Sequence, residues 1–168
     1  MSETFFIADP HFGHKAIIAY ENRPFSTVEE MDQALIANWN GVVGKNDKVY
    51  LLGDFSFHPA ELTAAIAKKL RGLKHLVIGN HDVKSVNAYY EMGFHRVYDC
   101  PIILDNFWIL SHEPLYVNSN MPYANIFGHV HSNKIYADHS SQSFCVSVER
   151  IDYTPISFTR IKSVVGNN

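Results

Sequence analysis

The first half of the chain alternates between short apolar runs and longer segments with hydrophobic residues at helical spacing. Three runs have the length of a strand, and each stops at an aspartate or a glycine: residues 4–8, 48–52 and 75–78. Between them, the spacing of hydrophobic residues predicts a helix that starts at residue 26 and ends at Gly41 or Gly44, and a second over residues 59–71. A third helix is expected over residues 83–92. The pattern therefore predicts buried strands that alternate with helices.

The second half of the chain is richer in strand-like segments. Asp105 and Asn106 separate two of these segments in the pattern of a tight hairpin turn. The expected strands are residues 102–104, 107–110, 125–127, 144–148 and 156–161. Strand–helix units followed by hairpins, with no linker and no internal repeat, predict one α/β domain over residues 1–168, with two sheets and helices outside them.

Composition adds the first indication of function. Hydrophobic residues at 46% and charged residues at 18% fit a globular protein, and the formal net charge of −3 disfavours dedicated nucleic-acid binding. Ten histidines in 168 residues exceed what a core of this size requires. This excess indicates a metal site.

Other features of the sequence bear on where the protein works. Cys100 and Cys145 are too few for a disulfide scaffold, and both adjoin apolar segments, so we expect buried free thiols. The residues after Met1 do not form a signal peptide, and no apolar run approaches the roughly 20 residues of a membrane helix. We expect a cytoplasmic protein with no membrane partner.

Side chains that bind metals follow the predicted strands at five places. Loops at the ends of strands converge on one crevice in α/β folds, and alternate residues of an extended segment point the same way. Glycines precede Asp54, Asn80 and His129, which suits backbone that turns sharply or approaches another group closely. The five segments are Asp9-Pro10-His11, Gly53-Asp54, Gly79-Asn80-His81-Asp82, Ser111-His112 and Gly128-His129-Val130-His131.

The chemistry of these side chains favours two metal ions over one. Carboxylate, imidazole and amide groups together suit Mn, Fe, Zn or Co. Seven such ligands are too many for one tetrahedral zinc but suit two ions that share a bridging carboxylate. Taken alone, each segment has a structural alternative, such as a helix cap at Asn80 or Asp82 or a core histidine at His112. Five such segments, all at predicted strand ends, together favour the metal site.

These five segments, in this order, resemble the signature of the calcineurin-like metallophosphoesterases. The stretch Asp9-Pro10-His11-Phe12-Gly13-His14 is similar to a small single-domain branch found in bacteria and phages. The resemblance implies a four-layer α/β/β/α sandwich with the metals at the edges of the sheets. It also implies a division of the ligands: Asp9, His11 and His131 on one metal, Asn80, His112 and His129 on the other, and Asp54 as the bridge.

Two positions depart from the pattern of the family without removing a ligand. Phe57 stands where many relatives carry a second aspartate, and Ser111 stands where many carry glycine. The resemblance implies two ions roughly 3.5–4 Å apart that lower the pKa of a bridging water, whose hydroxide attacks phosphorus in line. It also implies that His81 gives the leaving oxygen a proton. Asp82 is expected to orient the His81 ring or to raise its pKa.

Three further polar residues lie near these segments. His14 is a candidate for contact with the phosphate, and the alternative is a solvent-exposed histidine at the start of a helix. Arg23 is a second candidate because a guanidinium binds phosphate in a bidentate manner, although a salt bridge with Glu21 is the favoured interpretation. His58 is expected to cap the helix that begins at Pro59.

The features together favour a phosphodiesterase or phosphomonoesterase acting on a small nucleotide or a similar phosphate ester. Two divalent metal ions are the expected cofactors, with Mn favoured and Fe, Zn, Co or Ni as alternatives. A chain of 168 residues leaves no room for a cap domain, so the site is expected to be open. A nuclease or a protein phosphatase of the same superfamily is the alternative. A non-catalytic scaffold is disfavoured because His81 and all the expected ligands are present.

Overall fold

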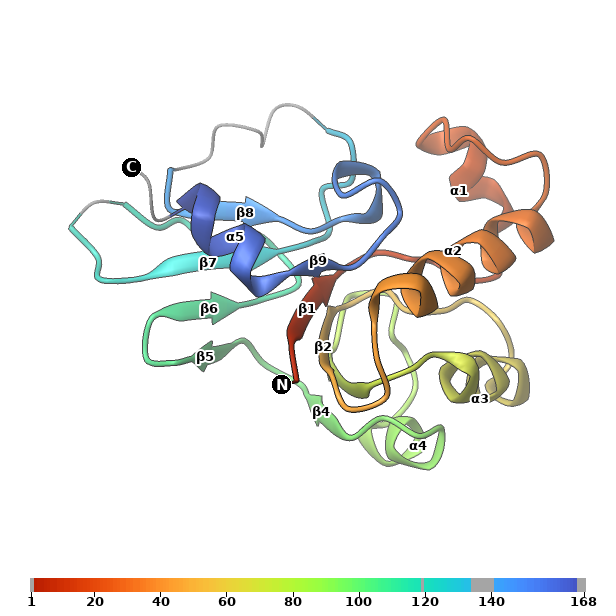
Figure 1. Ribbon diagram of the computed structural model, residues 1–168. Helices are drawn as coiled ribbons and strands as arrows, with labels where there is room; N and C mark the ends of the chain where they lie inside the picture. Colours follow the sequence, from red (N-terminus) through yellow and green to blue (C-terminus); the bar gives the residue numbers. More distant parts are fainter. Residues whose placement is uncertain (1, 119, 134–140, 166–168) are drawn as a thin grey trace.

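Two β-sheets and five α-helices make up the described part of the computed structural model, which is residues 2–118, 120–133 and 141–165 (Figure 1). The strands are β1 (Thr4–Ile7), β2 (Lys48–Leu52), β3 (Leu73–Val77), β4 (Arg96–Tyr98), β5 (Ile102–Leu104), β6 (Trp108–Leu110), β7 (Ala124–Phe127), β8 (Ser143–Cys145) and β9 (Ile156–Ser157). The helices are α1 (Lys15–Tyr20), α2 (Val28–Val42), α3 (Ala60–Lys69), α4 (Val86–Glu91) and α5 (Phe158–Val165). A short 3-10 helix covers Val148–Arg150.

The two sheets have different strand orders. The first sheet has the order β4-β3-β2-β1-β9, in which β1 to β4 are parallel and β9 is antiparallel at the edge. The second has the order β5-β6-β7-β8, and its β5–β6 pair is antiparallel. In Figure 1, α2, α3 and α4 lie beside the first sheet, and α5 packs against strands of both sheets. This arrangement confirms the expected α/β class with two sheets and helices.

One cluster of buried hydrophobic residues connects the two sheets. The ring of Phe158 in α5 lies 5.3 Å from that of Phe6 on β1 and 5.3 Å from that of Trp108 on β6. Burial of such rings is worth about 1.5–3 kcal/mol each. An isolated bridge pairs Ala8, just after β1, with Ser147, just after β8. The sheets therefore meet at the end of β1 where the first metal-binding segment begins.

Helix α2 begins where its capping residues predict. The Thr27 hydroxyl oxygen accepts a hydrogen bond from the backbone N–H of Glu30 at 3.1 Å, and the Glu30 carboxylate accepts one from the backbone N–H of Ser26 at 2.7 Å. The side chains that bury this helix against the core recur at helical spacing: Met31, Leu35 and Trp39. The pattern of hydrophobic positions thus predicted both the start of α2 and its buried face.

The strand expected over residues 156–161 is wrong. Only Ile156 and Ser157 form a strand, and α5 begins directly afterwards. Phe158, Ile161 and Val165 are buried on one face of this helix. A short apolar run does not distinguish a strand from a buried helix segment, and the helical period appears here only over eight residues. Helix α1 and strand β4 also have no counterpart among the expected elements.

The two cysteines lie in different surroundings. Cys145 is buried, as expected, and burial raises the pKa of its thiol. Cys100 is exposed, which corrects the expectation of a buried thiol, because the segment after β4 runs over the surface before β5 begins. Among the described helices, none has the length and apolar character needed to cross a membrane.

Candidate metal centre

The seven expected ligands come together at the carboxyl ends of strands from both sheets. They follow β1, β2 and β3 of the first sheet and β6 and β7 of the second. Their ligand atoms form three overlapping groups: Asp9 with His11 and His131, Asp9 with Asp54 and His112, and Asn80 with His112 and His129. The first of these is called the Asp9 set below, and the last is called the His112 set.

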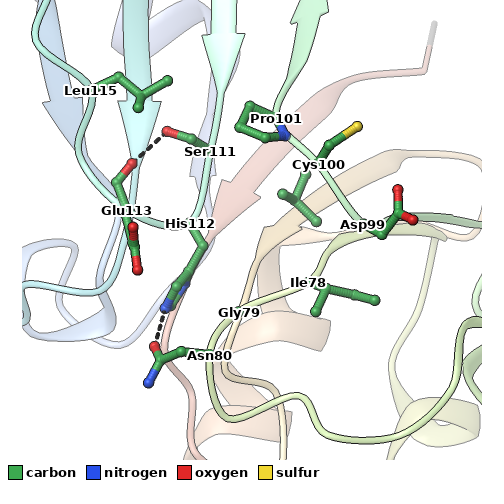
Figure 2. A pocket seen from close by; sticks show the side chains of 11 residues that line it. Ile78, Gly79, Asn80, Asp99, Cys100, Pro101, Ser111, His112, Glu113 and Leu115 are labelled. Atoms are coloured by element: carbon green, nitrogen blue, oxygen red, sulfur yellow. Dashed lines mark hydrogen bonds between the residues drawn. The ribbon is translucent and has the colours of Figure 1, made fainter.

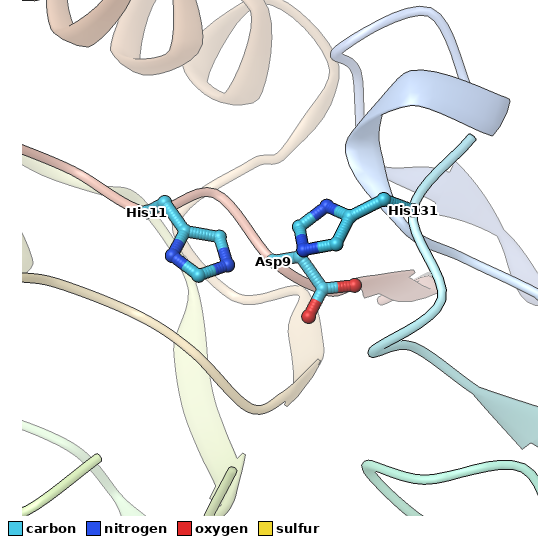
Figure 3. Close-up of side chains that lie close together, drawn as sticks. All are labelled: Asp9, His11 and His131. Atoms are coloured by element: carbon cyan, nitrogen blue, oxygen red, sulfur yellow. The ribbon is translucent and has the colours of Figure 1, made fainter. Parts of the chain in front are cut away.

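The Asp9 set contains buried polar atoms that no other group satisfies. The ligand atoms of Asp9, His11 and His131 lie within 4.8 Å of one another, and their side chains share one space in Figure 3. One Asp9 carboxylate oxygen accepts hydrogen bonds from the His129 backbone N–H at 2.8 Å and the Ser147 hydroxyl at 2.6 Å. The other oxygen and both ring nitrogens of His11 are buried without a hydrogen-bond partner. Because unpaired buried polar atoms are costly, these atoms fit a site that holds a cation.

The His112 set brings three ligand atoms within 3.1 Å of one another. His112 Nδ1 lies 2.8 Å from the Leu52 carbonyl oxygen, which can only accept, so Nδ1 carries the proton. Nε2 is then the nitrogen left for a ligand bond, and it lies 2.8 Å from the Asn80 side-chain oxygen. His129 Nδ1 lies 3.1 Å from each of these two atoms. Neighbouring ligands of an ion with bonds of about 2.1 Å lie about 3 Å apart, so these distances match a coordination shell.

Asp54 lies between the two sets. Its Oδ2 is 3.5 Å from His11 Nε2 and 3.6 Å from His112 Nε2, and the side chain is only 2% exposed. Its other oxygen accepts a hydrogen bond from the backbone N–H of His81 at 2.9 Å. One carboxylate oxygen therefore faces both sets, as a bridging ligand requires.

Burial perturbs the titration of the Asp9 set. Burial raises the pKa of the Asp9 carboxyl to about 6, although His131 and His112 partly oppose the shift. Burial lowers the pKa of His11 to about 2, and His131 and Arg23 lower it further. The imidazole is thus neutral, which is the form that binds metal, and a cation would compensate the carboxylate charge that burial disfavours.

The backbone of the site is held in an uncommon conformation. Five of the seven expected ligands have a positive φ between 48° and 69°: Asp9, His11, Asp54, His129 and His131. Aspartate and histidine adopt this left-handed region more readily than most residues, and its cost is tolerated where surrounding structure enforces it. The backbone N–H groups of Asp9 and His11 donate to the carbonyl oxygens of Gly53 and Asp54, each at 3.1 Å. Two metal-binding loops are thereby fixed against each other.

Two of the glycines before the ligands are required by close approach. A Cβ at Gly79 would lie 2.6 Å from the Asp54 backbone nitrogen, and a Cβ at Gly128 would lie 2.8 Å from Asp9 Oδ2. Real Cβ contacts are essentially never shorter than 3.0 Å. The expectation from the sequence, that backbone approaches another group closely at these glycines, is confirmed.

Glu149 supports the site and was not among the expected residues. Its two carboxylate oxygens lie 3.1 and 3.2 Å from His131 Nδ1, so the proton of that ring is held on Nδ1 and Nε2 is left for a ligand bond. Glu149 follows the strand expected at residues 144–148 almost directly. Like Asp9 and Asp54, it is a carboxylate at the end of an expected strand, but it lies outside the five segments identified in the sequence.

Arg23 holds Glu149 and the backbone of Asp9 and Pro10, and its guanidinium is not free to bind a phosphate. Its guanidinium bonds to Glu149 at 2.6 and 2.9 Å and donates to the backbone carbonyl oxygens of Asp9 and Pro10, each at 2.8 Å. The residue is 4% exposed. The structure thus corrects two interpretations, because the partner is Glu149 in place of Glu21, and the donors that would bind phosphate are already occupied.

Asp82 also has a different role from the expected one. Its carboxylate accepts hydrogen bonds from the backbone N–H groups of Asp54 at 2.7 Å, Gly79 at 2.9 Å and Phe55 at 3.0 Å, and from the Tyr89 hydroxyl at 3.2 Å. These bonds occupy both oxygens in a buried position, so Asp82 fixes the loops of Asp54 and Gly79 and is not oriented toward the His81 ring. This corrects the expectation that it aligns His81.

Phe57 packs among the imidazole rings of His11, His14 and His81. Its ring is stacked on that of His14, with centroids 4.1 Å apart, and lies 5.1 Å from His81 and 5.3 Å from His11. His81 is exposed, while His14 is half-buried and its Nδ1 has no hydrogen-bond partner. The Phe57 ring therefore packs against both His14 and His81.

Comparison with known proteins adds a family to this geometry. A family model described as calcineurin-like phosphoesterase matches residues 4–163. The chain is 34% identical over 178 residues to the Uncharacterized protein MJ1445 of Methanocaldococcus jannaschii, covering 98% of this chain and 92% of that one. It is 39% identical over 85 residues to the Gene 66 protein of Mycobacterium phage L5, covering 49% and 41% of the two chains. A protein of unknown function from Aquifex aeolicus, AQ665, has a similar crystal structure, with a TM-score of 0.77, 26% identity and coverage of 97% and 99%.

Proposed function

The chain belongs to the calcineurin-like phosphoesterase family, and on this basis we propose that it is a two-metal enzyme that hydrolyses a small phosphate ester. The membership supports a metal-dependent phosphoesterase in general. The number of metals, the ligand assignment and the substrate are the parts that we propose from the geometry of the site.

The contact between His112 and Asn80 carries the proposal. His112 Nε2 lies 2.8 Å from the Asn80 side-chain oxygen, and His129 Nδ1 lies 3.1 Å from both atoms. A cation between these three atoms would use all of them as ligands. The unpaired atoms of Asp9 and His11 support a second cation in the same way, and Asp54 faces both positions. Nitrogen and oxygen ligands without thiolates favour Mn, with Fe, Zn, Co or Ni as alternatives.

The residues around the proposed metal ligands hold those ligands in position. When bound, two divalent ions supply electrostatic stabilisation of the phosphoryl oxygens and a water of lowered pKa. Asp82 holds the loops of Asp54 and Gly79 through three backbone N–H groups, and Glu149 holds the His131 ring. These contacts keep the ligand atoms in place before substrate arrives, which lowers the cost of reorganisation.

His81 is the proposed proton donor to the leaving oxygen. Its ring is exposed and packs beside Phe57, while its backbone N–H is anchored on Asp54. A side chain in this position reaches a phosphate ester that is held at the metal ligands. No carboxylate is hydrogen-bonded to the ring among the described contacts, so packing by Phe57 takes the place of that support.

The alternatives remain a nuclease, a protein phosphatase or a non-catalytic scaffold. The net charge of −3 is unfavourable for holding a polyanion. A scaffold would have no use for a proton donor that is exposed beside two sets of converging ligand atoms. Hydrolysis of a small ester is therefore the function that we test first.

The first test measures metal content and hydrolysis together. Protein loaded with Mn and passed through a desalting column is expected to retain about two equivalents per chain and to hydrolyse bis-p-nitrophenyl phosphate. Removal of the metal with a chelator is expected to abolish turnover, and added Mn is expected to restore it. Absence of bound metal after loading would refute the site, whereas bound metal without hydrolysis of any ester would favour the scaffold.

The second test separates the proton donor from the metal ligands. For an ester with an alkoxide leaving group, which needs a proton, His81→Ala is expected to lower kcat by about 10²–10⁴-fold while metal content stays at the wild-type level, because His81 is not a proposed ligand. His95→Ala is the matched control, since His95 is also exposed but lies at the start of β4. Equal activity of the two variants would show that His81 does not donate the proton.

A further inference from the structure

A cleft of about 300 Å³ adjoins the His112 set. One wall is formed by Ile78, Gly79 and Asn80 after β3 and by residues 99–101 before β5, and the other by residues 111–115 after β6 (Figure 2). Asn80 and His112 line the cleft, whereas His81 does not. The ring of His81 lies instead beside Phe57 and His11, near the Asp9 set. The proposed proton donor and the cleft therefore flank different halves of the metal centre.

We propose that this cleft binds the organic group that phosphorus keeps during hydrolysis, so that the substrate is a phosphodiester. The proposal rests on the proposed function. In an in-line displacement, the attacking oxygen and the leaving oxygen lie on one axis, and the substituents that stay on phosphorus project to the side. If the leaving oxygen is next to His81, a retained substituent is directed toward Asn80 and His112, where the cleft begins. A monoester has no such substituent and would leave the cleft empty.

The lining of the cleft defines the chemistry of that group. Ile78, Pro101 and Leu115 give it apolar walls, and its volume suits a single compact ring system. The exposed carboxylates of Asp99 and Glu113 lie on opposite walls (Figure 2). Two negative charges disfavour a second phosphate in this space. The retained group is thus neutral and apolar or aromatic, such as an aryl group or a nucleoside base, and is not a polyphosphate.

Phosphonate esters isolate the retained group from the leaving group. In p-nitrophenyl phenylphosphonate and p-nitrophenyl methylphosphonate, water adds its oxygen to phosphorus, the bond to the same p-nitrophenolate breaks, and the P–C bond stays. With the Mn-loaded enzyme, we expect kcat/KM to be about tenfold higher for the phenyl ester, because only the phenyl ring fills the cleft. A ratio near one would overturn the proposal.

Two matched substitutions test the location of the effect. Leu115→Ala is expected to reduce the phenyl-to-methyl ratio to about threefold or less, and Leu73→Ala is expected to leave it unchanged. Leu115 is 37% exposed and Leu73 is 41% exposed, so neither removal opens the core, and Leu73 lies at the far end of β3. If Leu115→Ala lowers kcat/KM for p-nitrophenyl phosphate as much as for the phenyl ester, the cleft holds the leaving group and the proposal is wrong.

Cys100 provides a readout that does not depend on turnover. The chain has two cysteines, of which Cys145 is buried with a raised pKa and Cys100 is exposed at the wall of the cleft. Phenylphosphonate, which the enzyme does not cleave, is expected to slow alkylation of Cys100 by iodoacetamide more than methylphosphonate does, as measured by mass spectrometry on the Mn-loaded protein. Protection without hydrolysis of any ester would reject the proposed function but retain the cleft as a binding site. Hydrolysis with equal alkylation rates for the two phosphonates would reject the cleft and retain the function.

Discussion

Glu149 connects parts of the metal centre that are far apart in the chain. Its carboxylate contacts the ring of His131 and the guanidinium of Arg23, and Arg23 in turn donates to the backbone carbonyl oxygens of Asp9 and Pro10. The geometry of two expected ligands, Asp9 and His131, thus depends on one buried ion pair. A buried guanidinium that loses its carboxylate partner is strongly destabilising, so the charge at position 149 matters as well as its shape.

The substitution Glu149→Gln tests this connection. The amide keeps an oxygen that can accept from His131 but removes the charge that compensates Arg23. We expect Mn affinity to fall by about 10–100-fold, as is typical when a residue behind a metal ligand is changed. Calorimetric titration of Mn into metal-free protein measures the change, and Glu61→Gln, at an exposed position of α3, is the control. Unchanged affinity would show that Glu149 is only a structural partner of Arg23.

The elements differ in how much of them could be predicted from the sequence. The strands β1, β2 and β3 were predictable because each is an apolar run that ends at a metal-binding segment, and α2 was predictable from its cap and its buried face. The segment that starts at Phe158 was not, because three buried residues in one short helix do not establish a period. Short elements that are held by tertiary packing carry little local signal.

In the candidate site too, features that depend on neighbouring residues could be predicted, and features that depend on residues far apart in the chain could not. The seven candidate ligands could be proposed because their residue types and their places after strands are local properties of the sequence. The roles of Asp82 and Arg23 depend on contacts with Asp54, 28 positions away, and Glu149, 126 positions away. No spacing rule contains such pairs, so Asp82 was assigned to the chemistry of His81 and Arg23 to the wrong salt-bridge partner or to phosphate, whereas the structure uses both as supports.

The loop after β3 is expected to tolerate no added side chain. A Cβ on Gly79 would meet the backbone nitrogen of Asp54 at 2.6 Å and His112 Cε1 at 2.9 Å, and the backbone atom can yield only if the Asp54 loop moves. We expect Gly79→Ala to lower the free energy of unfolding by about 1–3 kcal/mol and to reduce metal retention.

Gly41 in α2 provides the matched control for this loop. A Cβ there meets nothing within 4 Å, so Gly41→Ala is expected to leave metal binding unchanged and to raise the free energy of unfolding by up to about 1 kcal/mol. Thermal unfolding and metal analysis of both variants make the comparison. Full metal retention by Gly79→Ala would show that the loop adapts and that its close approach is not needed for the site.

At the scale of the whole molecule, the two sheets close around a group of charged and polar side chains. Asp9, His11 and Asp54 are each at most 2% exposed, and they lie where the core would otherwise continue between the sheets. Without a cation, burial of these groups opposes folding, because the carboxylate of Asp9 must lose its hydration. The fold therefore contains an unfavourable interaction that a bound cation would relieve.

Asp9→Asn is expected to be more stable than the wild type without metal and less stable than the wild type with metal. Burial raises the folded pKa of Asp9 to about 6 from its usual value of 3.8, so the metal-free fold binds this proton more tightly than the unfolded chain does. The wild type accordingly loses stability relative to Asp9→Asn as the pH rises from about 4 to 6, and the difference reaches about 3 kcal/mol near neutral pH. The low pKa of His11 acts in both proteins and cancels in the difference, and asparagine tolerates the positive φ at this position.

Denaturant unfolding of both proteins in a chelator, from pH 4 to 8, measures this difference directly. Asp47→Asn is the control with the opposite sign, because hydrogen bonds from the backbone N–H groups of Glu3 and Gly44 lower the pKa of that carboxyl. With Mn at a hundredfold excess over its dissociation constant, the wild type is expected to gain about 2.7 kcal/mol for each bound ion, and Asp9→Asn is expected to gain clearly less. If the variant is no more stable than the wild type in chelator, the buried Asp9 carboxylate does not oppose folding, and metal binding cannot be relieving it.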